Sequence, residues 1–151
     1  MDSLKAAIKE NYTIDGGIGI PLFASAVAPM FDRVMISLAS PLVRNKVYTL
    51  TVVLVSDCVG NRIGKSKFTT QVGLSEQVLK SDVILNEILF NPTPAATDYV
   101  EIYNRSNKIL DLRQLYIANR NTTGAIGNLV QLSTESNLIF PQEFRVITAS
   151  A

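Results

Sequence analysis

The sequence contains no histidine and no tryptophan, and it has a single cysteine, Cys58. Histidine is the commonest general base and the commonest metal ligand, so a Ser-His-Asp or Cys-His catalytic arrangement is excluded within this chain. One cysteine excludes an internal disulfide, and the missing tryptophan excludes the Cys-Trp-Cys core of antibody-type domains. These absences point away from side-chain catalysis and toward a binding or structural role.

Strong charge and long apolar runs are also missing. The 14 basic and 13 acidic residues give a net charge of +1, and the basic residues are scattered, so no field attracts nucleic acid or an anionic membrane. No apolar run approaches the roughly 20 residues that span a bilayer. We therefore expect no nucleic-acid partner, no membrane span and no cofactor.

Strand patterns dominate both halves of the chain. Residues 47–55 (VYTLTVVLV) are dense in β-branched side chains and predict the central strand of a sheet. Residues 83–90 and 99–103 predict a strand pair on either side of a proline-rich break. Further strands are predicted at residues 12–14, 33–38, 68–72, 110–118, 129–132 and 144–148, and a short helix within residues 1–11. Many short strands without a sustained helical period predict an all-β sandwich.

Acidic residues gather around the predicted strand pair. Glu87, Asp98 and Glu101 carry the hard oxygen ligands that calcium prefers, although no EF-hand spacing is present. Strict alternation places Glu87 on the face of Leu85, and Glu101 on the face of Tyr99. Each carboxylate needs a hydrogen-bond partner if it is buried. Two interpretations stay open: carboxylates bonded to loop backbone amides, which we favour, and calcium ligands.

Residues 57–64 (DCVGNRIG) predict a turn. Gly60 and Asn61 tolerate positive φ, and Asp57 can accept backbone hydrogen bonds that tighten the bend. The run at residues 60–66 (GNRIGKS) has only three residues between its glycines, whereas a phosphate-binding loop needs four and a helix after them. We interpret this run as a turn and not as a nucleotide site.

Motifs in the second half resemble the bacterial lamin tail domain. They are VILNEILFNP at residues 83–92, DYVEIYN at 98–104, LDL at 110–112 and LYI at 115–117. The resemblance covers residues 82–151 and implies an immunoglobulin-like β-sandwich without catalytic residues. It also implies a structural role, fixing strand register and the intervening loop, for four polar residues: Asn86, Glu87, Glu101 and Asn104.

The first half is similar, less specifically, to the C-terminal part of a bacterial surface-layer type Ig-like module. The similarity lies in NYTI at residues 11–14, YTLTV at 48–52 and DCVGN at 57–61. In such a module, the turn from Asp57 to Asn61 closes the sandwich between its last two strands. We therefore expect two Ig-like modules, at residues 1–73 and 82–151, joined by a polar linker at 74–81.

Both modules are expected to be incomplete. The first lacks its opening strands, and the second stops after residues 146–148, where the lamin tail resemblance implies more strands and a closing hairpin. Missing strands leave sheet edges and apolar faces open, which favours pairing with another copy of the chain.

The resemblances imply a function as well as a fold. Bacterial lamin tail domains are non-catalytic modules of large secreted or surface proteins, some of them hydrolases. We expect a spacer or protein-interaction module of an exported protein, outside the cell, on its surface or in the periplasm, whose partners are proteins or other modules of the same chain. The alternative is a carbohydrate- or calcium-dependent binding module accessory to a larger secreted hydrolase.

Overall fold

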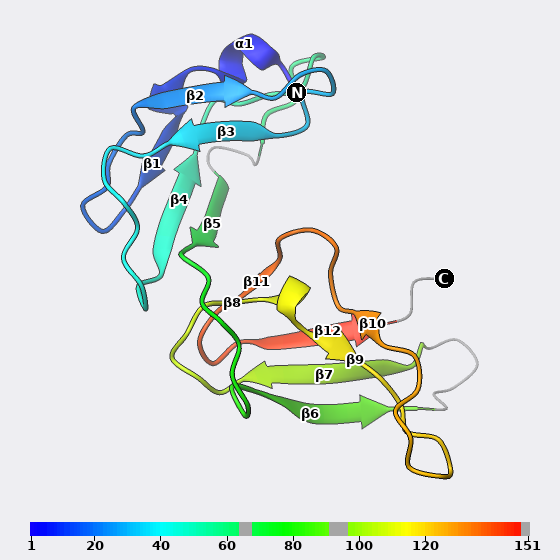
Figure 1. The fold of residues 1–151 in the computed structure, drawn as a ribbon. Helices are drawn as coiled ribbons and strands as arrows, with labels where there is room; N and C mark the ends of the chain where they lie inside the picture. The colour runs from blue at the N-terminus through cyan, green and yellow to red at the C-terminus, as the bar shows by residue number, and fades with distance from the viewer. Residues whose placement is uncertain (64–67, 91–96, 149–151) are drawn as a thin grey trace. The chain divides into compact units, whose positions relative to one another are not determined.

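The computed structural model describes residues 1–63, 68–90 and 97–148. Strands hold 38% of the described residues and helices 7%, and the sheets are antiparallel, so the predicted all-β, sandwich-type fold is confirmed. The chain divides into two compact units, Met1–Gly73 and Leu74–Ala151, each with a core of its own (Figure 1). Across the described ranges, no helix has both the length and the apolar character to cross a membrane.

The first unit packs a three-stranded antiparallel sheet against a two-stranded hairpin (Figure 1). The sheet has the order β1-β4-β5, so the strand predicted to be central is central. Its elements are α1 (Ser3–Ala6), the 3-10 helix η1 (Lys9–Asn11), β1 (Tyr12–Ile14), β2 (Phe23–Ala26), β3 (Val34–Ser37), β4 (Tyr48–Val52) and β5 (Phe68–Val72).

The core of the first unit forms because β4 buries both of its ends. Val52 is buried against Tyr12 of β1 and Ala24 of β2, and Tyr48 is buried against Ile14 and Ile18 in a second cluster. Gly16, after β1, has a φ of +66°, and a Cβ atom on it would lie 2.9 Å from the Tyr48 ring. Only glycine fits this turn without strain.

The second unit is built on a three-stranded antiparallel sheet in the order β12-β7-β6. Two short antiparallel ladders, β8 with β11 and β9 with β10, lie over one face of it. The elements are β6 (Val83–Leu89), β7 (Tyr99–Asn104), β8 (Leu110–Asp111), the 3-10 helix η2 (Leu112–Gln114), β9 (Tyr116–Ile117), β10 (Val130–Gln131), β11 (Leu138–Ile139) and β12 (Phe144–Thr148). We call the sheet face toward the ladders the inner face and the opposite one the outer face.

The core of the second unit lies between the sheet and the β8–β11 ladder. Ile102 from β7 contributes to it from the sheet, and Leu110, Leu112 and Ile139 contribute from the covering layer. The single strand predicted at residues 110–118 is wrong: the structure has β8, then η2, then β9. The break follows from the Asp111 side chain, which caps η2.

Residues 74–81, the predicted linker, lie within the second unit. The backbone N–H of Glu76 donates to the Ile109 carbonyl at 2.8 Å, and Glu76 forms a parallel bridge with Leu110. Val78 packs against the core. The polar composition of the segment predicts a connector, and its backbone forms one isolated bridge to β8.

Candidate functional site

A β-bulge decides where the two central carboxylates lie. Leu85 pairs with Ile102, whereas Glu87 pairs with Glu101, so Asn86 is an extra residue in β6. The insertion shifts the alternation by one position, which places Glu87 on the outer face and Leu85 on the inner face. The prediction that Glu87 shares a face with Leu85 is therefore wrong, because strict alternation does not anticipate a bulge.

Glu87 and Glu101 stand directly opposite each other on the outer face. The Tyr99 hydroxyl donates to Glu87 Oε1 at 2.7 Å, and the Asn86 amide donates to Glu101 Oε1 at 2.7 Å. The hydrogen bond to Glu87 raises the pKa of Tyr99. These partners are side chains of the same strand pair and not the loop amides that we favoured.

The third calcium candidate is Asp98, the residue that precedes β7. Asp98 lines the apolar groove described below, together with Ile88 and Val100. Calcium takes about six to eight oxygen ligands. Within residues 1–63, 68–90 and 97–148, no three acidic or cysteine side chains come together in a group that could hold a metal ion.

Asn104, at the end of β7, is fully buried. Its amide nitrogen donates to the carbonyl oxygens of Lys108, Ile139 and Phe140 at 2.8, 3.2 and 3.0 Å, and its amide oxygen accepts from the Ser106 N–H and hydroxyl at 3.0 and 2.7 Å. One side chain thus joins β7, the loop that follows it and the connection from β11 to β12. This is the geometry of a residue that fixes a loop.

Asp57 organises a turn in the first unit. Its Oδ1 accepts from the backbone N–H groups of Val59 and Asn61 at 3.0 and 2.8 Å, and its Oδ2 accepts from the Asn61 side chain at 2.8 Å. The Asn61 amide lowers the pKa of Asp57. Gly60 takes a φ of +95° between them. Residues 64–66 of the glycine-containing run lie outside the described residues, as do Asn91 and Pro92 of the first lamin-tail motif.

Asp111 is a buried carboxylate whose role the sequence did not reveal. Arg113 Nη2 and the Ser136 hydroxyl donate to Oδ2 at 2.7 and 2.8 Å, and the Arg113 N–H donates to Oδ1 at 3.0 Å. Burial by itself raises the pKa of Asp111, but these hydrogen bonds outweigh it and lower the pKa to about 2. No local pattern marks this residue, because Ser136 approaches it only through the β8–β11 pairing.

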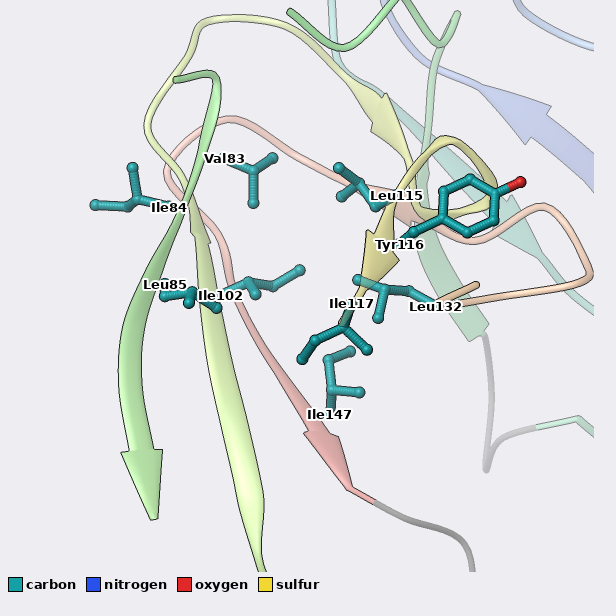
Figure 2. Close-up of a pocket in the computed structure, with 9 residues that line it drawn as sticks. All are labelled: Val83, Ile84, Leu85, Ile102, Leu115, Tyr116, Ile117, Leu132 and Ile147. Atoms are coloured by element: carbon teal, nitrogen blue, oxygen red, sulfur yellow. The ribbon is translucent and has the colours of Figure 1, made fainter. Parts of the chain in front are cut away.

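The inner face of the sheet is only partly covered. Leu85 and Ile88 on β6 are 58% and 56% exposed. A cavity of about 160 Å³ lies beneath β9, and Figure 2 shows Ile102, Leu115 and Ile147 directed into it while Ile84 points away. We call the adjoining hollow of about 420 Å³ the apolar groove; it is lined by Ile88, Leu89, Phe90, Asp98, Tyr99, Val100, Ile117, Val130, Ile147 and Thr148.

β6 is also an edge strand. Across the described ranges of the chain it pairs with β7 alone, so its other side presents unpaired backbone groups. The apolar residues of β6 are typical of a buried strand. Whether a covering layer reaches them depends on residues far along the chain.

Comparison of the chain with protein-family models, with curated proteins and with solved structures gives no match. The resemblance to the lamin tail domain and to surface-layer Ig-like modules therefore rests on the motifs alone.

Proposed function

We propose that this chain is a non-catalytic, Ig-like spacer and protein-interaction module of an exported bacterial protein, built from a surface-layer type segment and a lamin-tail-like segment. The observation that carries the proposal is β6, an edge strand with an open side and an apolar inner face. A strand of this kind accepts another strand by backbone pairing, and its side-chain pockets add affinity.

The polar residues support a non-catalytic role. Asn104 and Asp57 are the sequence candidates with the densest hydrogen bonding, and both hold turns through short bonds to nearby backbone groups or side chains. Asp111, the buried carboxylate, caps a 3-10 helix. The chain has no histidine, and these acid and amide groups hold turns or cap a helix. Few side chains therefore remain that could act as general acid or base.

The partner that fits β6 is an extended segment with apolar side chains at alternate positions. Backbone groups of such a segment pair with the open side of β6, and its apolar side chains cover Leu85, Ile88 and the apolar groove. A second copy of β6 has this pattern and serves as the partner in purified protein. Other modules of the parent protein supply it in the native setting.

Replacing Ile88 with lysine is expected to abolish concentration-dependent dimerisation of the purified chain. A lysine on an edge strand blocks pairing because its charge would be buried against the partner. Ile88 is exposed in the single chain, so the variant should still fold. Sedimentation velocity across a concentration series measures the dimer.

The matched control is Ile126→Lys, which makes the same change at an exposed isoleucine in the loop between β9 and β10. It should dimerise like the wild type. A wild-type chain that stays monomeric at millimolar concentration, with β6 amides as protected from exchange as those of β7, would contradict the proposal.

The calcium-dependent alternative keeps one supporting observation, the two carboxylates facing each other on the outer face. Binding to the native state alone must raise the melting temperature. Under our proposal, millimolar calcium leaves the melting temperature unchanged in a thermal scan, with magnesium as the control. A rise that Glu87→Gln removes would establish the alternative instead.

A further inference from the structure

A separate cavity lies in the first unit beside α1. Its volume is about 280 Å³, near the lower end of small-molecule sites, which begin at roughly 300 Å³. It is lined by Lys5, Ile8, Asn11, Leu54, Ser56 and Arg62. Two of these side chains are cationic and none is acidic.

Both cationic residues are linked to the buried residue Ser56. Lys5 Nζ donates to Ser56 Oγ at 3.0 Å. Ser56 forms an antiparallel bridge with Arg62, and residues directly opposite in such a bridge project their side chains to the same face. Lys5, Ser56 and Arg62 therefore line the cavity together.

Positive charge at this cavity is only partly compensated. Asp2 Oδ2 lies 3.4 Å from Lys5 Nζ, but Asp2 Oδ1 already accepts the N–H groups of Leu4 and Lys5 as the cap of α1. The Arg62 side chain has no ion-pair or hydrogen-bond partner in the part of the chain that the structure describes. A lining with two cations and no acidic residue favours an anion.

The wall of the cavity is fixed and polar, and its rim is apolar. Ser56 and Asn11 are only 3% and 5% exposed, and the Asn11 amide is held by a 2.9 Å bond to the Lys5 carbonyl. Ile8 and Leu54 are exposed at the rim. Leu54 has a φ of +57°, a left-handed conformation that is rare for a leucine and that clusters at functional sites.

We propose that this cavity binds a small aliphatic carboxylate. The carboxylate lies between Lys5 and Arg62, where the planar guanidinium can hold both of its oxygens, and the aliphatic part covers Ile8 and Leu54. A compact inorganic anion would leave the apolar rim uncovered. The site is in the first unit and is independent of the interaction surface on β6.

Titration of the full chain with hexanoate, followed by amide chemical shifts, tests the site. Saturable shifts are expected at Lys5, Ser56 and Arg62. Hexanamide, which has the same aliphatic part and no charge, is expected to bind the wild type about tenfold more weakly than hexanoate does. Hexanoate is expected to bind the Arg62→Gln variant about tenfold more weakly than it binds the wild type. Each change removes a charge-assisted hydrogen bond. Arg62 is exposed, so this variant should fold.

Lys9→Gln is the matched control, because Lys9 is an exposed lysine on η1 that does not line the cavity. It should bind hexanoate like the wild type. The proposal is overturned if hexanamide and hexanoate bind equally, if Arg62→Gln binds as well as the wild type, or if no saturable shift appears up to about 50 mM hexanoate, which is beyond weak specific binding.

Discussion

Replacing Asn104 with alanine is expected to lower the free energy of unfolding by about 3 to 5 kcal/mol, since each buried polar group left unpaired costs about 1 to 3 kcal/mol. The change removes the donor for the carbonyls of Lys108, Ile139 and Phe140 and the acceptor for Ser106. It also leaves a small cavity at a fully buried site. Urea denaturation followed by circular dichroism measures the loss.

Asn107→Ala is the control, because Asn107 lies in the same loop and is exposed. It should change the free energy of unfolding by no more than about 0.5 kcal/mol, the usual range for surface substitutions. Equal effects of the two variants would show that Asn104 does not hold the loop. Asn104→Asp should be at least as damaging as alanine at neutral pH, because it points a carboxylate at three carbonyl oxygens.

Acidification is expected to destabilise the protein through Asp111. Its folded-state pKa is about 2, below the ordinary value of 3.8. A carboxyl group with a lowered pKa in the folded state stabilises that state fully above the unfolded value and loses this contribution as the pH falls through the folded value. The difference corresponds to about 2 kcal/mol, lost between about pH 5 and pH 1.

Asp111→Asn isolates this contribution from that of the other acidic groups. At pH 7 the variant should be about 2 to 4 kcal/mol less stable than the wild type, since the Arg113 and Ser136 donors lose a buried carboxylate. The difference should shrink by about 2 kcal/mol toward pH 2 as the wild-type carboxylate takes up a proton. Urea midpoints measured from pH 7 to pH 2 give both curves, and parallel curves would rule out the linkage.

Strands with a dense local signal were predictable from sequence. The strands at residues 12–14, 68–72 and 144–148 have the predicted bounds. β2 and β11 were not predicted, because FASA offers small residues without clear alternation, and the two residues Leu138 and Ile139 of β11 are too few for a period. Polarity identified the candidate residues in the sequence, but it did not identify their hydrogen-bond partners.

By itself, the sequence determined that the chain is built from strands and that it has no histidine for catalysis, because β-branched density and composition are properties of the chain alone. Only the tertiary structure decided that Glu87 faces Glu101, that Asp111 is buried, and that the inner face of β6 is open. A bulge, a cross-strand donor and a covering layer each depend on which distant residues meet. Local propensity and periodicity do not specify these contacts between residues that are distant in the sequence.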